Sequence, residues 1–265
     1  MEPSIVPRMD EVQIERQGSV ATVTGNRPEV KNACTHEMWG RRAESFSELG
    51  YDRAVRVVVV TGAGDAFCSG ADVSAFGQRS EEDLDSVQRM RQVGETVMAL
   101  HEMPKPTIAR VNGVAAGAGC NLALGCDLIV ASDQARFSEI FARRGLSLDF
   151  GGSWLLPRLV GLHRAKELAF FADIISAEEA QAMGLVNRVV PHAELDGFVA
   201  DWAQRLAQGP PLALAADKVM LNNSFSNSLG EALVDEGRAQ SLNFLAADTT
   251  EAARAWAEKR DPDFE

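Results

Sequence analysis

The 265-residue sequence contains few of the residue types that mark several classes of protein. It has four cysteines, four histidines and one tyrosine, and its 26 bases against 38 acids leave a net charge of −12. Four cysteines are too few for a disulfide framework, so we expect buried free thiols and a reducing compartment. The deficit of bases argues against non-specific nucleic-acid binding. The scattered histidines, with no HExxH motif, argue against a metal site.

Long apolar runs and phosphate-binding motifs are also missing. The most membrane-like stretch, 113–131, contains several glycines together with Asn121 and Asp127, so we expect no membrane-spanning segment. The first eleven residues lack the apolar centre of a signal peptide, which favours a cytoplasmic protein. No GxxxxGK[ST] motif occurs, and Gly62-Ala-Gly64 lacks the third glycine of a dinucleotide-binding turn.

Hydrophobic patterning in the first 160 residues predicts strands that alternate with helices. Runs of β-branched residues predict strands at 12–16, 20–24, 55–60, 107–111 and 127–131, and helical spacing predicts helices at 35–49 and 81–100. The continuous Val57–Val60 run indicates a strand that is buried on both faces. This alternation is typical of the α/β class.

From Gly161 onward the sequence predicts mainly helices. They cover 162–171, 177–183, 194–208, 211–222 and 231–246, with a short last helix after Thr249 and one extended segment at 188–190. Ser176 and Glu179 form a capping-box pattern before the second of these helices. We therefore divide the chain into a core, 1–200, and a helical C-terminal region, 201–265. The apolar faces of the C-terminal helices predict a trimer or hexamer.

Two glycine-rich loops, 62–73 and 111–122, each follow a predicted strand. Small residues allow backbone N–H groups to approach a ligand closely, and two such groups aimed at one point stabilise a developing oxyanion. The same residues also allow a strand and a helix to pack closely. From the residues alone, both interpretations stand.

Four segments, 26–32, 67–72, 105–113 and 175–187, occur in an order and spacing that resemble the enoyl-CoA hydratase/isomerase family, also called the crotonase family. The resemblance covers nearly the whole chain. It implies a crotonase-like spiral of β-β-α units with a helical C-terminal trimerisation region, assembled as a homotrimer or a dimer of trimers. It also implies an acyl- or enoyl-coenzyme A thioester as substrate, so that coenzyme A is part of the substrate and no separate cofactor is expected.

The resemblance places the two oxyanion donors at the backbone N–H groups of Ala71 and Ala118. Ala118 stands where relatives usually have glycine, and Ser74 stands where many have a lysine that meets the coenzyme A phosphate. Further residues are expected to contact the substrate: Arg27, Ser69, Gly70, Asp72, Gly117, Asn121, Phe141 and Trp154.

Hydratases of this family use two glutamates to add water, because one can activate the water while the other supplies a proton. The resemblance places those two positions at Asn121 and Phe141, neither of which exchanges a proton at neutral pH. Glu139 is an alternative carboxylate two residues before Phe141, either catalytic or a surface or trimer-contact residue.

Asp149 is the preferred candidate base, because isomerases of the family place an aspartate at this position. Its flanking Leu148 and Phe150 predict a loss of hydration and a raised pKa. The competing interpretation is a helix cap before the segment that starts near Gly151. One base suffices to move a double bond, so the sequence favours an enoyl-CoA isomerase. An enoyl-CoA hydratase and a non-catalytic acyl-CoA-binding protein are the alternatives.

Overall fold

The computed structural model describes residues 11–73 and 86–264, and it contains two sheets flanked by helices. The strands are β1 (Val12–Gln17), β2 (Val20–Gly25), β3 (Val57–Gly62), β4 (Ala66–Cys68), β5 (Thr107–Val111), β6 (Val114–Ala116), β7 (Leu128–Ser132), β8 (Arg136–Ser138), β9 (Ile175–Ser176) and β10 (Arg188–Val190). The helices are α1 (His36–Tyr51), α2 (Ser86–His101), α3 (Ala118–Leu124), α4 (Gly152–Val160), α5 (Leu162–Phe171), α6 (Ala177–Met183), α7 (Leu195–Ala207), α8 (Pro211–Asn223), α9 (Leu229–Asn243) and α10 (Ala247–Glu258).

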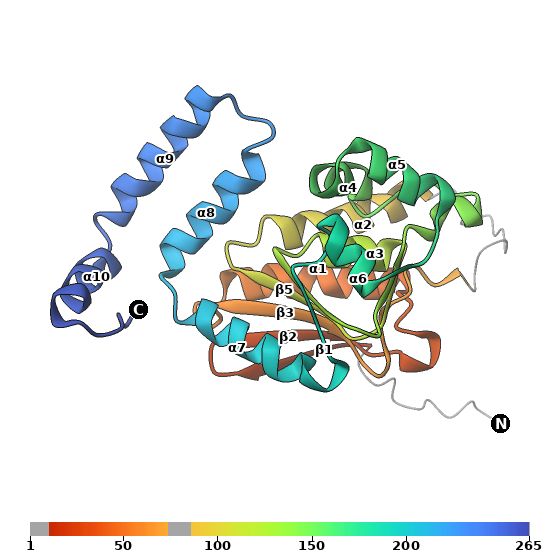
Figure 1. The fold of residues 1–265 in the computed structure, drawn as a ribbon, viewed down its shortest axis with the longest axis horizontal. Coiled ribbons are helices and arrows are strands. Elements are labelled where there is room, and N and C mark those ends of the chain that lie inside the picture. The colour runs from red at the N-terminus through yellow and green to blue at the C-terminus, as the bar shows by residue number, and fades with distance from the viewer. Residues whose placement is uncertain (1–10, 74–85, 265) are drawn as a thin grey trace.

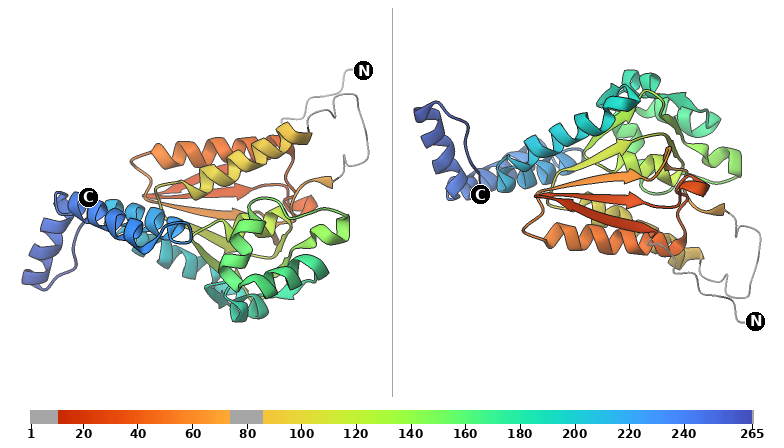
Figure 2. Two further views of the ribbon diagram at one scale, coloured as in Figure 1. Left: turned by 90° about the horizontal axis from the view of Figure 1, so that it is seen from above. Right: turned by 90° about the horizontal axis from the view of Figure 1, so that it is seen from below.

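Six strands form the larger sheet, in the order β1-β2-β3-β5-β7-β10, and only β1 and β2 pair antiparallel. All six residues of β3 are buried, because its alternate valines face two different hydrophobic clusters. Val58 and Val60 pack on the side of α1, and Val57 and Val59 pack on the side of α7. Figure 2 shows α1 and α2 on one side of this sheet and α7 on the other. The predicted burial of this strand on both faces is confirmed.

The smaller sheet has the order β4-β6-β8-β9 and receives the second strand of each repeating unit. Strands β3 and β4 precede α2, β5 and β6 precede α3, and β7 and β8 precede α4. Each unit therefore places one strand in each sheet before the chain enters a helix. This is the spiral of β-β-α units in an α/β protein that the sequence predicts.

Most predicted elements of the C-terminal third occur where expected. The bounds of α5, α6 and β10 match the predictions, and Ser176 and Glu179 form both hydrogen bonds of the capping box. Helix α9 starts at Leu229, two residues before the predicted start, because Ser228 and Glu231 form a second capping box. The predicted helix at 81–100 is described from Ser86 onward, and 81–85 lie outside the described residues.

The division between core and C-terminal region follows α7. The predicted boundary after residue 200 falls inside this helix, and Leu195, Val199, Ala203 and Ala207 all pack on the larger sheet. The helices that stand away from the core in Figures 1 and 2 are α8, α9 and α10. Helix α7 thus covers the larger sheet as far as Ala207.

Lys218 attaches α8 to the core. Its side chain is only 8% exposed, and its Nζ lies 2.9 Å from Asp127 Oδ2 and 3.1 Å from the carbonyl oxygen of Lys105. Asp127 Oδ2 also accepts hydrogen bonds from the backbone N–H and the hydroxyl of Thr107. A buried ammonium with these partners holds α8 in one position, whereas α9 contains no buried residue.

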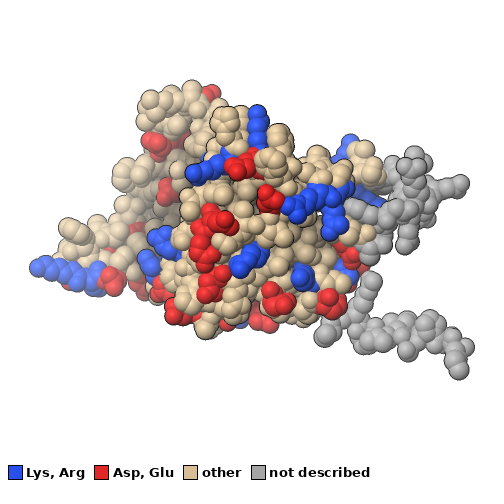
Figure 3. Space-filling model, turned by 45° about the vertical axis from the view of Figure 1, so that its right-hand side comes forward, with Lys and Arg blue, Asp and Glu red and all other residues tan. Residues whose placement is uncertain are grey.

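Acidic and basic side chains lie close together on the face shown in Figure 3. Among the helices of the described residues, none has the length and hydropathy needed to cross a membrane.

Candidate active site

A cavity of about 570 Å³ lies between the loop after β4, the start of α3, α2 and the loop before α4. Ala71, Ala118 and Asp149, the three residues predicted to carry the chemistry, all line it, together with Asp72. Trp39, Val93 and Leu148 supply apolar walls. The fold therefore brings the predicted oxyanion loops and the predicted base to one cavity, although Ala71 and Asp149 are 78 residues apart in the sequence.

The backbone N–H group of Ala71 takes no part in the pairing of its loop with the segment that contains Cys34. Ala71 forms a parallel bridge with Cys34, in which the Cys34 N–H donates to Gly70 and the Asp72 N–H donates to Cys34, both at 2.8 Å. In a parallel pair, the residue opposite such a bridge points its own N–H and carbonyl groups to the other side. The Ala71 N–H is thus directed away from Cys34.

Ala118 is the first residue of α3, so its N–H group has no acceptor within the helix. The turn before it depends on Gly117, whose φ of 55° and ψ of −128° suit glycine alone. Gly70, with φ of 98°, lies against this turn, since a Cβ atom built on it would be 3.5 Å from Ala118 N. The two loops are therefore adjacent.

The glycines of these loops also serve close packing. A Cβ atom on Gly119 would lie 2.1 Å from the carbonyl oxygen of Cys68, and one on Gly113 would overlap the carbonyl oxygen of Asp65. Both interpretations of the glycine-rich loops thus apply, because close packing of α3 on β4 is what brings Ala118 next to Gly70.

Arg27 and Asp72 hold the Ala71 loop rather than standing free. Arg27 Nη1 donates to Asp72 Oδ2 and to the carbonyl oxygen of Ala33, each at 2.8 Å, and the Arg27 side chain is 18% exposed. Ser69 is tied to the same neighbourhood, because its N–H donates to Lys31 and its hydroxyl to Val30. A contact between Arg27 and a coenzyme A phosphate remains a prediction. Ser74 lies outside the described residues.

Asp149 has the environment expected of a base. Burial raises its pKa from the ordinary 3.8 to about 6, and Oδ1 has no hydrogen-bond partner among the described residues. The side chain does not cap α4, whose N-cap is Gly151 with no side-chain capping bond. Phe150 and Gly151, with φ of 48° and 76°, turn the chain sharply between Asp149 and the helix.

Asn121 is fully buried and joins two parts of the site. Its Nδ2 donates to Glu139 Oε2 at 3.2 Å and to the backbone carbonyl oxygen of Asp149 at 3.0 Å. Gly152 leaves room for this amide, since a Cβ atom there would lie 2.3 Å from Nδ2. Asn121 thus fixes the turn that carries Asp149, a structural role that sequence reasoning did not assign.

Glu139 is not a surface residue, as one sequence interpretation had it, because it is only 2% exposed. Burial raises its pKa to about 7, the charge of Asp149 adds to the increase, and hydrogen bonds from Asn121 and Cys120 oppose it. Phe141, two residues later, is 6% exposed and lies against Gly117. The residue at position 141 is thus an apolar support for the oxyanion turn.

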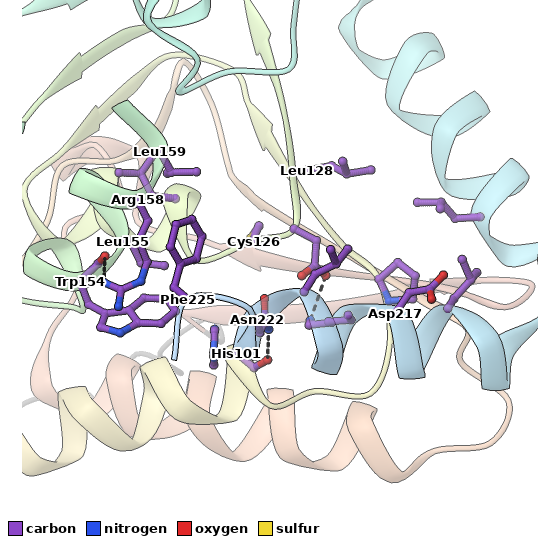
Figure 4. A pocket seen from close by; sticks show the side chains of 18 residues that line it. His101, Cys126, Leu128, Trp154, Leu155, Arg158, Leu159, Asp217, Asn222 and Phe225 are labelled. Carbon is purple, nitrogen blue, oxygen red and sulfur yellow. Dashed lines mark hydrogen bonds and ion pairs between the residues drawn. The ribbon is translucent and has the colours of Figure 1, made fainter. Parts of the chain in front are cut away.

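Trp154 lines a different cavity of about 400 Å³ between α4 and α8 (Figure 4). The Arg158 guanidinium lies 3.8 Å from the centre of the Trp154 ring, and the His101 ring meets the same indole edge-on at 5.4 Å. The structure does not place Trp154 among the residues that line the Asp149 cavity. Trp154, the third residue of α4, faces α8, and no sequence pattern indicated this direction.

The residues that the structure describes include no group of three or more histidine, cysteine, aspartate or glutamate side chains arranged to hold a metal ion. The cavity instead brings together the two predicted backbone donors, at Ala71 and Ala118, and the desolvated carboxyl group of Asp149. This arrangement suits chemistry on a carbonyl compound that passes through an oxyanion.

Comparison with known proteins agrees with the fold. Residues 15–265 match the family model described as enoyl-CoA hydratase/isomerase, and the chain belongs to that family. It is therefore an enzyme of the enoyl-CoA hydratase/isomerase family, with the crotonase fold.

Similar proteins include some that are named hydratases and one that is named an isomerase. The chain is 40% identical to a Rhodobacter capsulatus protein named "Probable enoyl-CoA hydratase", over 96% of this chain and 97% of that one. It is 38% identical to the 1,2-epoxyphenylacetyl-CoA isomerase of Escherichia coli, over 92% of this chain and 94% of that one. An enoyl-CoA hydratase structure from Mycobacterium smegmatis superposes with a TM-score of 0.90 at 32% identity, covering 97% and 99% of the two chains.

Proposed function

We propose that this protein is an enoyl-CoA isomerase in which Asp149 is the only base. The observation that carries the proposal is the position of Asp149, a desolvated carboxyl group in the same cavity as the N–H groups of Ala71 and Ala118. Asn121 and Phe141, where the resemblance puts the hydratase glutamates, hold a backbone carbonyl and support a turn. One relative at 38% identity is named an isomerase.

The proposed reaction moves one proton. The Asp149 carboxylate takes a proton from a carbon that is acidified by the thioester, and the electron pair of that C–H bond moves to the thioester oxygen. The N–H groups of Ala71 and Ala118 stabilise the resulting enolate. Asp149 then returns the proton to the other end of the conjugated system, so the double bond shifts and no water is added. No cofactor is needed.

A hydratase is the second candidate, and Glu139 is the observation that favours it. Its carboxyl group has a pKa of about 7, which suits proton transfer at neutral pH. Glu139 is buried behind Asn121, however, and is not among the residues lining the cavity. Water addition by Glu139 would therefore require Asn121 to move.

The first experiment incubates the protein with a panel of 2-enoyl, 3-enoyl and dienoyl coenzyme A thioesters, in H2O and in D2O. The products are identified by absorbance and mass spectrometry. Isomerisation leaves the mass unchanged in H2O, whereas hydration adds the mass of one water. Binding without any product would favour the acyl-CoA-binding alternative.

The second experiment is Asp149→Asn, which removes the proposed base and keeps the shape of the side chain. We expect isomerisation to fall by at least roughly 100-fold while thioester binding persists. Isomerisation at the wild-type rate in Asp149→Asn would refute the assignment of the base.

A cytoplasmic location and a homotrimer or dimer of trimers are part of the same proposal. The free cysteines Cys34 and Cys68, whose Sγ atoms lie 3.7 Å apart, suit a reducing compartment.

A further inference from the structure

A second carboxyl group lies directly behind the proposed base, and the mechanism above does not use it. Glu139 follows β8, and at 2% exposure it is more buried than any other acidic residue among those described. A buried carboxyl group is destabilising unless its oxygens are hydrogen-bonded, and Glu139 Oε1 has no hydrogen-bond partner among the described residues. Its presence therefore calls for a function.

The hydrogen bonds of Glu139 lead to Asp149. Asn121 Nδ2 donates to Glu139 Oε2 at 3.2 Å and to the Asp149 carbonyl oxygen at 3.0 Å, so one amide group joins the two acidic residues. The Gly152 N–H donates to the same carbonyl oxygen at 2.9 Å. The Asp149 turn is thus held from α3 on one side and from α4 on the other.

Two titratable groups from other elements face Glu139, the Cys120 thiol from α3 and the Asp149 carboxyl group from the loop before α4. Burial and the nearby Glu139 charge raise the pKa of Cys120 well above its ordinary value, so the thiol stays neutral. Glu139 and Asp149 are therefore the groups of this cluster that change charge near neutral pH. The charge of Asp149 raises the pKa of Glu139, whereas the raised pKa of Asp149 itself comes from burial. Because the interaction of two charges is mutual, an ionised Glu139 also disfavours the ionised form of Asp149.

We propose that Glu139 is a positioning residue for Asp149. Through Asn121 it holds the turn that presents the Asp149 carboxylate to the cavity, and its negative charge makes that carboxylate a stronger base. This inference rests on the proposed function of Asp149, and it adds a second ionisation that controls the same site.

The test compares Glu139→Gln with wild type, because glutamine keeps the size and an oxygen acceptor for Asn121 but does not ionise. Wild-type isomerisation should rise with pH in two steps, first as Asp149 ionises and then as Glu139 does. Glu139→Gln should show only the first step and a rate roughly three- to tenfold lower at pH 8. Glu178→Gln, at an exposed carboxyl group on α6, is the matched control and should keep both steps.

A second measurement needs no substrate. The titration of the Glu139 carboxyl group, followed by infrared or carbon NMR difference spectra against Glu139→Gln, should move to lower pH by roughly half a unit or more in Asp149→Asn. Two steps persisting in Glu139→Gln, or an unchanged Glu139 titration in Asp149→Asn, would overturn the inference. Isomerisation that survives Asp149→Asn would instead refute the proposed base, and the titration would still decide whether the two carboxyl groups are coupled.

Discussion

Asp149 destabilises the folded protein at neutral pH, since its carboxyl group ionises less readily there than in the unfolded chain. Its folded pKa of about 6 lies above the ordinary 3.8, so the folded state binds this proton more tightly. Stability is therefore lost as the pH rises from about 4 to about 6, and the full penalty applies above that range. A shift of this size corresponds to about 3 kcal/mol at most.

We predict that Asp149→Asn stabilises the protein above about pH 6 while it lowers the rate of isomerisation. The gain in the free energy of unfolding should be about 1–3 kcal/mol at pH 7 and should vanish below about pH 3, where Asp149 is protonated in both states. Denaturant unfolding of both proteins at about pH 3 and about pH 7 measures this difference. An equal stability of the two proteins at pH 7 would show that Asp149 is not desolvated.

The donor at Ala118 provides a prediction about shape. Ala118 is 3% exposed and lines the cavity, so a β-branched side chain there crowds the thioester oxygen. Removing one oxyanion donor costs about 3–4 kcal/mol of transition-state stabilisation, and Ala118→Val should lose a large part of this. We expect kcat to fall at least about tenfold with a smaller change in melting temperature. Unchanged kcat would place the oxyanion site elsewhere.

At the residue scale, four of the predicted site residues line the cavity: Ala71, Asp72, Ala118 and Asp149. The other predicted residues, Arg27, Ser69, Gly70, Gly117, Asn121, Phe141 and Trp154, are not among those that line it. Ala71, Ala118 and Asp149 follow from motifs, because each motif keeps a fixed spacing from its strand. The burial of Glu139 depends on Asn121, which is 18 residues away and meets it only after both sheets have formed. The direction of Trp154 depends on the turn at Phe150, whose left-handed conformation no pattern indicates.

At the scale of secondary-structure elements, the contact of α3 with β4 decides whether the oxyanion site forms. A Cβ atom on Gly119 would lie 2.1 Å from a backbone carbonyl oxygen, which has no room to move. Gly119→Ala should therefore displace α3, destabilise the protein by about 1–3 kcal/mol and reduce turnover.

Gly197→Ala is the matched control for this prediction, because a Cβ atom on Gly197, in α7, meets nothing within 4 Å. Alanine there should stabilise the protein by about 0.5–1 kcal/mol with turnover unchanged. Thermal unfolding and kcat for the two variants separate backbone propensity from close packing. Equal stability of the two variants would contradict the packing argument.

Elements with strong local signals were predictable from the sequence. Helices α5 and α6 match because glycine or a capping box marks their starts, whereas α9 was predicted two residues late although Ser228 and Glu231 carried the same capping signal. The predicted boundary after residue 200 falls inside α7, which packs on the larger sheet through long-range contacts.

At the scale of the whole molecule, the C-terminal region leaves several large apolar side chains exposed to solvent. Leu233, Leu242, Phe244 and Leu245 are each more than half exposed, and Trp256 is 87% exposed. We predict a trimer or a dimer of trimers in solution, because a soluble protein rarely leaves such a surface uncovered.

Light scattering at micromolar concentration tests this assembly. The double substitution Phe244→Glu with Leu245→Glu should shift the mass toward the monomer, since it places charges on the surface that associates. A monomeric wild-type protein would contradict the prediction.

The contact of Lys218, on α8, with Asp127 in the core has a consequence for the order in which the chain folds. The Lys218 contact with Asp127 forms within one chain, whereas α9 has no buried residue that its own chain could order. Refolding should then occur in two phases. The first, which forms the core and docks α8, proceeds at a rate that does not depend on protein concentration. The second, which orders α9, becomes faster as the concentration rises.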